Sequence, residues 1–192
     1  MKNIDDLKEK IKKYVPYNTQ EEEDKEVIIE CMDKYEDVLS RKNKLCHFTA
    51  SAWIVNKERT KVLMVHHNIY NSWSWVGGHA DGNSDLLQVA LKEIREETGL
   101  KKIDLVTNAI FGIAILTVEG HVKKKEYVSS HLHFDCCYLI EADEEDEVRP
   151  KKDENSAVQW IQIDEVLKKS KEEKMKPIYK KLIDKLSKFY IN

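Results

Sequence analysis

The sequence predicts an α+β domain in which helices flank a central sheet on both sides. Three observations lead to this prediction. Apolar residues recur at helical spacing near the start of the chain, strand-like runs fill its middle, and helical spacing returns after Asp164. With 192 residues the chain is long enough for one domain with a sizeable core, so we expect a single domain carrying extensions.

Residues 1–40 are predicted to form two helices, separated near Pro16 because proline cannot continue a helix. Each helix has an apolar stripe at helical spacing, formed in the first by Ile4, Leu7, Ile11 and Tyr14 and in the second by Val27, Cys31, Tyr35 and Val38. We interpret residues 1–40 as a helical extension and residues 41–192 as the main domain.

The main domain begins with segments rich in β-branched and aromatic residues, which are typical of strands. We predict strands at 47–56, 61–67, 109–119, 130–140 and 157–163. A helix over about 84–98 separates the early strands from the late ones, and Gly99 is well placed to end it. The acidic segment 141–155 is predicted to be a solvated loop between two strands, and the chain after Asp164 a helix broken near Pro177.

Charge and composition exclude some classes of partner. The 32 Lys and Arg residues nearly balance 35 Asp and Glu residues, and the net charge of −3 offers no general attraction to nucleic acids or anionic membranes. No run is long and apolar enough for a membrane span or a secretory signal, so we expect a cytoplasmic protein. The cysteines have no CxxC spacing, and we interpret Cys31, Cys46, Cys136 and Cys137 as reduced, small apolar residues.

The predicted helix at 84–98 carries three glutamates in its last turns, directly after a glycine-rich segment. Glu93 and Glu97 stand at i,i+4 and repel each other, although Glu96 can pair with Lys92. Both lie beside the apolar face of the helix and are expected to be half buried. A hard divalent cation with oxygen ligands, such as Mg²⁺, would remove the repulsion and keep coordination sites open for water and phosphate.

The stretch GGHADGNSDLLQVALKEIREETGL, residues 77–100, resembles the Nudix box. That motif has a glycine, five residues, a Glu, seven residues, and then an Arg-Glu-apolar-x-Glu-Glu-x-Gly-apolar signature, which corresponds here to residues 92–100. The resemblance is looser over about 45–165 and does not cover 1–40. It implies an α/β/α sandwich around a mixed sheet, with the helical extension added, and hydrolysis of a nucleoside diphosphate linked to another moiety.

The resemblance also implies roles for individual residues. Glu93, Glu96 and Glu97 match the box positions that hold Mg²⁺ or Mn²⁺, and the carbonyl of Gly78 can supply a further ligand. All three glutamates are therefore candidate catalytic residues. The family does not use one fixed glutamate to deprotonate the attacking water, so geometry must assign the general base.

Glu154 is the candidate catalytic residue outside the box. In Nudix proteins an acidic residue often reaches the metals from a loop before a late strand, and Glu154 precedes Trp160 by six positions. By resemblance it would be a metal ligand or the base, whereas its residue type alone fits a solvated loop carboxylate equally well.

Two positions depart from the box: Ser84 replaces its first Glu, and Lys92 replaces its Arg. We hypothesise that the usual residues hold loop and helix together through a bidentate pair that Ser and Lys cannot form. The metal-binding glutamates are unaffected by either change.

Four residues are predicted to bind substrate. His79 directly follows the double glycine, close to the expected phosphate chain, and Trp73 lies just before it, where its ring could stack on a base. His131 and His133 share one face of a strand with Asp135, an arrangement that suits phosphate contact or a metal; we favour substrate contact.

The sequence thus predicts a Mg²⁺-dependent pyrophosphohydrolase for a small nucleotide-type substrate, either an ADP-ribose-like compound or a modified nucleoside triphosphate. One alternative is a non-catalytic nucleotide-sugar sensor, motivated by Ser84 and Lys92. Another is an enzyme resembling isopentenyl diphosphate isomerase, which needs a cysteine that WSWVGGHADG lacks. The helices of residues 1–40 would either cover the sheet or meet a second subunit in a homodimer.

Overall fold

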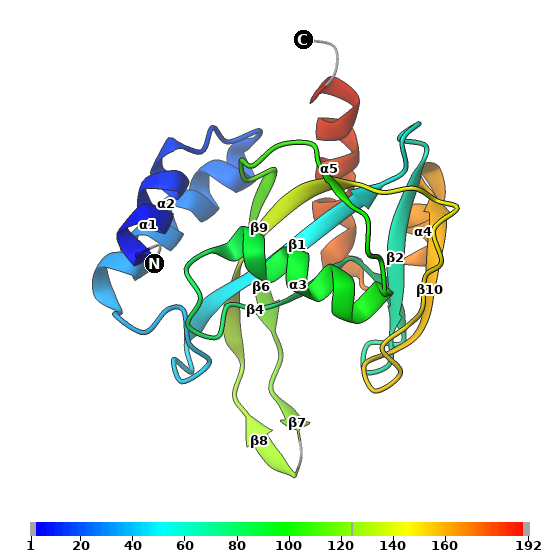
Figure 1. The fold of residues 1–192 in the computed structure, drawn as a ribbon. Helices are drawn as coiled ribbons and strands as arrows, with labels where there is room; N and C mark the ends of the chain where they lie inside the picture. The colour runs from blue at the N-terminus through cyan, green and yellow to red at the C-terminus, as the bar shows by residue number, and fades with distance from the viewer. Residues whose placement is uncertain (1–2, 124, 190–192) are drawn as a thin grey trace.

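The structure, a computed structural model, describes residues 3–123 and 125–189 and has the predicted α+β architecture (Figure 1). Residues 1–2 of the predicted extension and residues 190–192 of the predicted main domain lie outside the described residues. The helices of the extension lie at one side of a central sheet, and the remaining helices lie over its two faces.

An eight-stranded mixed sheet forms the centre of the fold. Its strands are β1 (Cys46–Val55), β2 (Lys61–His67), β3 (Ser72–Ser74), β4 (Val76–His79), β5 (Asp104–Leu105), β6 (Gly112–Val118), β9 (His131–Glu141) and β10 (Asn155–Gln162). The main path runs β10-β2-β1-β9-β5, while β3 pairs with β2, β4 with β1, and β6 with β9. β1 and β9 are parallel, and β7 (His121–Lys123) forms a separate hairpin with β8 (Glu126–Val128).

Five α-helices accompany the sheet within the described residues: α1 (Ile4–Lys13), α2 (Thr19–Lys34), α3 (Leu86–Thr98), α4 (Val166–Lys169) and α5 (Lys176–Phe189). The break in the C-terminal helix was predicted near Pro177, but it lies earlier, between Lys169 and Glu173. The chain leaves helical structure after α4, and Pro177 lies in the first turn of α5, where the missing N–H of proline costs no hydrogen bond. None of the helices that the structure describes has the length and apolar character to cross a bilayer.

The predicted strands agree with β1, β2, β6, β9 and β10 to within three residues at each end. The short strands β3, β4, β5, β7 and β8 were not predicted. The glycine-rich segment before α3 was expected to form a loop. This prediction is partly wrong, because Gly77 and Gly78 lie in β4 and pair with Ser51 and Ala50 of β1. Pairing with a buried strand overrides the weak strand propensity of glycine.

Two apolar clusters cover the two faces of the sheet. The first joins one face of β1 and β9 to α3, through Val89, Ala90 and Ile94, and also contains residues of α1 and α2. The second joins the opposite face to α5 through Tyr179, Leu182 and Leu186. Cys136 lies in the first cluster and Cys137 in the second, as expected for neighbours on a strand, and all four cysteines are free.

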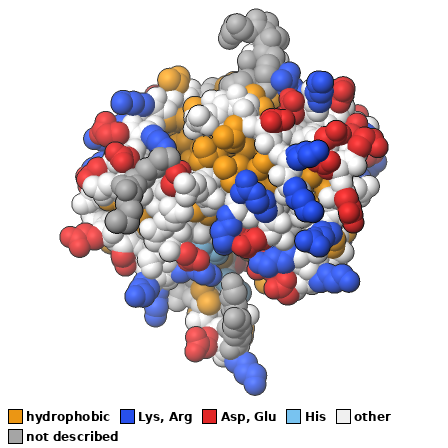
Figure 2. Space-filling model, viewed as in Figure 1, with side chains coloured by type: hydrophobic (Ala, Val, Ile, Leu, Met, Phe, Trp, Pro, Cys, Tyr) orange, Lys and Arg blue, Asp and Glu red, His pale blue; other side chains and the backbone are white. Residues whose placement is uncertain are grey.

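Acidic and basic side chains are interspersed over much of the face in Figure 2, in keeping with the near balance of charge in the sequence. The acidic segment 141–155 connects β9 to β10, as predicted. Its side chains are mostly exposed or half exposed, with Ala142 and Asn155 as the buried exceptions.

Glu21 fastens the N-terminal extension to the rest of the fold. Its carboxylate is fully buried on α2, 2.9 Å from the Lys181 ammonium of α5, and it accepts hydrogen bonds from the Tyr14 hydroxyl at 2.5 Å and from two backbone N–H groups. Burial would raise the pKa of Glu21, but Lys181, Tyr14 and Lys185 outweigh it and hold that pKa below 4.5. The extension is therefore tied to α5 and to β6 by a buried ion pair.

We predict that Glu21→Gln lowers the free energy of unfolding by about 3 kcal/mol at neutral pH, because Lys181 would then be buried without its counter-charge. A lowered pKa stabilises the fold above the unfolded value of 4.5, and this contribution is lost as pH falls through the folded pKa. The difference between native chain and variant should therefore be constant above pH 4.5 and shrink below it. Urea unfolding across this range measures it. Glu23→Gln, at an exposed site on α2, is the control, and an equal loss in both variants would contradict the prediction.

Candidate functional site

The candidate site is built where α3 approaches β4. A Cβ atom on Gly78 would lie 2.6 Å from Cδ of Glu93, and one on Gly77 would lie 2.7 Å from the carbonyl oxygen of Ala50. Side chains at these two positions would thus collide with the helix or with β1. The double glycine allows α3 to bring its glutamates directly against the strand.

Glu97 is held in place on both of its oxygens. Its Oε1 accepts the backbone N–H of Gly77 at 3.2 Å, its Oε2 accepts the Asn155 side-chain amide at 2.8 Å, and the residue is 4% exposed. Burial raises the pKa of Glu97 to about 7 despite these two hydrogen bonds. The site thus holds a buried carboxylate with a fixed orientation and a raised pKa.

Glu93 is partly buried, with 14% of its side chain exposed. Burial raises its pKa, and Lys92, with its ammonium 3.5 Å from Oε1, opposes that rise. The nearby Glu96 adds like charge. The sequence prediction that Glu93 and Glu97 lie at the edge of the buried face of the helix agrees with these exposures, and Glu97 is more deeply buried than expected.

Glu96 and Glu154 form the outer part of the site. Lys151 links them, with its ammonium 3.1 Å from Glu154 and 3.8 Å from Glu96, and Lys92 lies 3.4 Å from the other oxygen of Glu96. Glu154 also raises the pKa of Glu97, which places its charge close to the buried carboxylate. The structure therefore brings together all four glutamates that the sequence singled out.

This donor set suits a hard divalent cation. Four carboxylates, of which Glu97 is buried and Glu93 partly buried and both have a raised pKa, provide the oxygen ligands that Mg²⁺ prefers. Among the described residues, Lys92 and Lys151 supply the positive charge nearest to these glutamates. The roles of the individual residues, including the carbonyl of Gly78, remain predictions.

The three histidines predicted to bind substrate, His79 of β4 and His131 and His133 of β9, lie together. They lie on the face of the sheet opposite the glutamates. His79 is within 4.9 Å of His133, ring centre to ring centre, and His131 is 4.9 Å from His133. Strand neighbours point to opposite faces, so His79 faces away from the side on which Gly78 meets Glu93. Asp135, which shares this face, is engaged by the hydroxyls of Thr49 and Ser51.

His47 completes this histidine cluster, and the sequence analysis missed it. It pairs with His133 across the parallel strands β1 and β9, with ring centres 4.9 Å apart. Only the register of that pairing, which joins segments far apart in the chain, reveals the contact. Burial lowers the pKa of both residues, to about 2 for His133, so both imidazoles are neutral at physiological pH.

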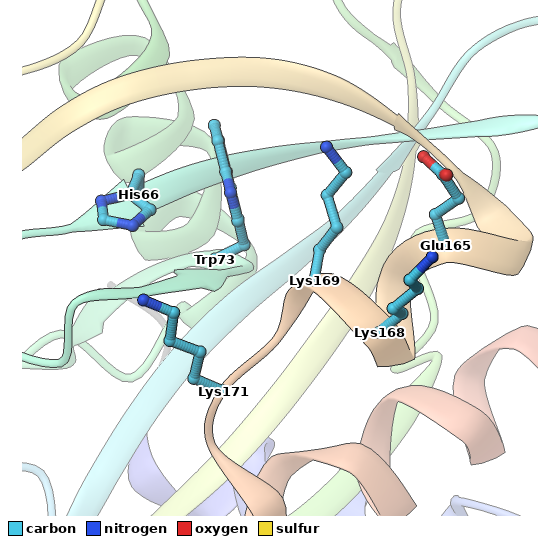
Figure 3. Close-up of a pocket in the computed structure, with 6 residues that line it drawn as sticks. All are labelled: His66, Trp73, Glu165, Lys168, Lys169 and Lys171. Carbon is cyan, nitrogen blue, oxygen red and sulfur yellow. The ribbon is translucent and has the colours of Figure 1, made fainter.

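Trp73 lies elsewhere, in a surface pocket of about 470 Å³ on the side of α4 (Figure 3). Its ring packs edge to face with His66, at 5.2 Å between ring centres. Lys169 of α4 and Lys171 after it extend toward the side of the pocket that holds these rings, whereas Lys168 points toward Glu165. The lining consists of His66, Trp73, Glu165, Lys168, Lys169 and Lys171. The lysines were not predicted as site residues, because their spacing on the sequence is that of a solvated helix.

The pocket is connected to the glutamates through β10. Ser156 forms a 2.8 Å hydrogen bond with His66, and its neighbour Asn155 donates to Glu97. The pocket and the acidic site thus contact the same strand but from different faces of the sheet, because Trp73 packs against the second apolar cluster whereas α3 lies over the first.

Comparison with known proteins agrees with these features. The pattern of the NUDIX domain matches residues 47–184, which is most of the chain but excludes α1 and α2. A search of curated proteins found no match.

Solved structures share the fold at low sequence identity. A hydrolase of the NUDIX family from Clostridium perfringens is 24% identical, with a TM-score of 0.51, and the match covers 73% of this chain and 97% of that one. The E. coli dihydroneopterin triphosphate pyrophosphohydrolase is 12% identical, with a TM-score of 0.57 and coverage of 71% and 94%. The Nudix hydrolase RenU from M. smegmatis is 15% identical, with a TM-score of 0.52 and coverage of 74% and 84%. Together with the match over residues 47–184, the fold and the glutamate site show that this chain belongs to the Nudix family and is a hydrolase of pyrophosphate bonds.

Proposed function

We propose that the chain is a Mg²⁺-dependent pyrophosphohydrolase that cleaves a nucleoside diphosphate linked to another moiety. The observation that carries the proposal is the pair of the partly buried Glu93 and the buried Glu97, set against the double glycine with Glu96 and Glu154 beside them. Substrates of this class, such as ADP-ribose-like compounds and modified nucleoside triphosphates, combine an aromatic base with a charged phosphate chain. Mn²⁺ would serve in place of Mg²⁺.

Glu93, Glu96 and Glu97 would hold the metal, which when bound supplies an activated water and neutralises charge on the phosphate under attack. The Gly77 N–H and the Asn155 amide orient the carboxylate of Glu97 toward that role. Burial of Glu93 and Glu97 limits the water around them, which strengthens their interaction with a cation. The carbonyl of Gly78 would be a further ligand of the same cation.

Glu154 is our candidate for the proton acceptor. Its side chain is 46% exposed, so solvent water reaches it, and its charge acts on Glu97. Lys151, 3.1 Å away, would release this carboxylate when substrate phosphates compete for the ammonium. The attacking water would then lose its proton to a carboxylate that is not needed as a buried ligand.

For substrate recognition we assign the base to Trp73 and the negatively charged part of the substrate to the lysines around α4. The indole of Trp73 lines the pocket and would offer a ring face for stacking, and Lys168, Lys169 and Lys171 offer ammonium groups in the same pocket.

A non-catalytic nucleotide-sugar sensor is the second candidate. It is favoured by Lys92, whose ammonium lies 3.5 Å from Glu93 and 3.4 Å from Glu96 and so competes with a metal for these ligands. Turnover separates the two candidates, because a sensor would bind its nucleotide tightly without cleaving it.

Glu97→Gln is expected to abolish nearly all turnover without weakening the fold. The amide cannot supply the charge that the metal needs, yet it removes a buried carboxylate that is costly to ionise. Hydrolysis of a panel of nucleoside diphosphate derivatives with Mg²⁺ or Mn²⁺, followed by ³¹P NMR, measures the effect. Glu23→Gln should retain full turnover. A native chain that cleaves no member of the panel would contradict the proposed activity.

Asn155→Ala is expected to weaken Mg²⁺ binding about 10- to 100-fold. Asn155 donates a hydrogen bond that orients the carboxylate of Glu97, and the loss of such a partner of a metal ligand typically has that cost. Loss of the amide should also raise the pKa of Glu97 further. Isothermal titration with Mg²⁺ and the magnesium dependence of turnover both report the change. Unaltered magnesium affinity would show that Glu97 needs no such support.

Trp73→Ala should raise KM about tenfold and leave kcat nearly unchanged, because stacking of a base on an aromatic ring contributes about 1–3 kcal/mol. Trp73→Phe, which keeps a smaller ring, should restore most of the loss. Steady-state kinetics on the best substrate of the panel measures both variants. If kcat falls while KM is unchanged, the pocket does not bind the base.

A further inference from the structure

We propose that His47, His79 and His133 form a second metal site, for a divalent transition ion such as Zn²⁺, on the face of the sheet opposite the glutamates. One ligand atom from each of these three residues lies within 4.8 Å of the others. The inference does not depend on the proposed pyrophosphohydrolase activity, because it concerns a different set of ligands and a different class of ion.

His47 provides the most direct observation. Its Nδ1 lies 3.0 Å from the carbonyl oxygen of Asn43, which only accepts, so Nδ1 carries the proton and Nε2 carries a lone pair. That Nε2 is buried and has no hydrogen-bond partner among the described residues, in a side chain that is 4% exposed. A buried polar atom without a partner is costly, and a metal ion would satisfy it.

His131 fixes the proton of the next ligand. Its Nδ1 donates to the carbonyl of Ser129 at 2.8 Å, so its Nε2 accepts, and the Nε2 of His133 at 3.1 Å must be the donor. The lone pair of His133 is then on Nδ1. A ligand histidine whose other nitrogen donates to a fixed acceptor is the usual arrangement in protein metal sites, so we assign His131 as a positioning residue.

The chemistry of these ligands selects the ion. Imidazole nitrogens suit Zn²⁺ and its neighbours in the transition series, whereas Mg²⁺ prefers the oxygen ligands of the acidic site. The nearest carboxylate on the same face, Asp135, is already bonded to two hydroxyls. The positive charge of Arg41, which acts on His133, is balanced by its bidentate pair with Asp81.

Small side-chain rotations would complete the geometry. Tetrahedral zinc needs its ligand nitrogens about 3.3 Å apart, which follows from Zn–N distances of about 2.0–2.1 Å. The three nitrogens must therefore approach one another by up to about 1.5 Å from the 4.8 Å limit. His79 and His133 are only partly buried and would make most of this movement, whereas His47 is buried. Their exposed side leaves a fourth position for water or for an anionic oxygen.

The test is direct binding of Zn²⁺ to the full chain without an affinity tag. We expect one tightly bound zinc per chain that millimolar Mg²⁺ does not displace, measured by titration and by elemental analysis after gel filtration. Substitution with Co²⁺ should give the visible absorption of a tetrahedral nitrogen site. His79→Gln and His133→Gln should each lose stoichiometric zinc, and because both side chains are half exposed, these variants should fold like the native chain by circular dichroism.

Two controls separate this site from the glutamates. His121→Gln, in the β7–β8 hairpin, and Glu97→Gln, in the acidic site, should both keep the zinc. Loss of zinc in Glu97→Gln with retention in His133→Gln would place the ion in the acidic site and overturn the inference. Absence of stoichiometric zinc from the native chain would overturn it as well, whatever the chain hydrolyses.

Discussion

The close approach of α3 to β4 is the constraint on which the candidate site depends. Both Gly77 and Gly78 lie where a Cβ atom would collide with a neighbour, Ala50 in one case and Glu93 in the other. Because the strand has no side chains there, the helix lies near enough for the backbone N–H of Gly77 to reach Glu97. The high pKa of Glu97 and the crowding of Glu93 follow from the burial that this approach imposes. Any account of metal binding in this protein therefore begins with the two glycines.

The sequence predicted the parts of the fold that are decided by local pattern. The helical extension, five strands and the helix ending at Gly99 follow from the spacing of apolar residues and from turn chemistry, and Gly99 has the positive φ of 74° that ends the helix. The short strands, by contrast, are determined by pairing. β4 has two glycines and would not be chosen on propensity, yet it is held by four pairs with β1.

The same division applies to the candidate site. The four glutamates were identified because three lie on one helix and resemble a known motif, and Glu154 followed from its place before a late strand. Asn155, Lys151 and His47 were missed, because each acts through a contact between segments far apart in sequence. Trp73 and the histidines were grouped as one substrate site, but the structure separates them. Their side chains lie in a basic pocket and in a histidine cluster, respectively.

The parallel pairing of β1 with β9 has a consequence for how the chain folds. It joins residues such as Thr49 and Asp135, which are 86 positions apart, and the whole of α3 and β6 lies between them. Closing so long a segment costs chain entropy before any contact repays it, and folds rich in such distant contacts form slowly. During synthesis, the edge of β1 that pairs with β9 has no partner until β9 has left the ribosome. An open strand edge of this kind favours pairing with other chains, and so aggregation.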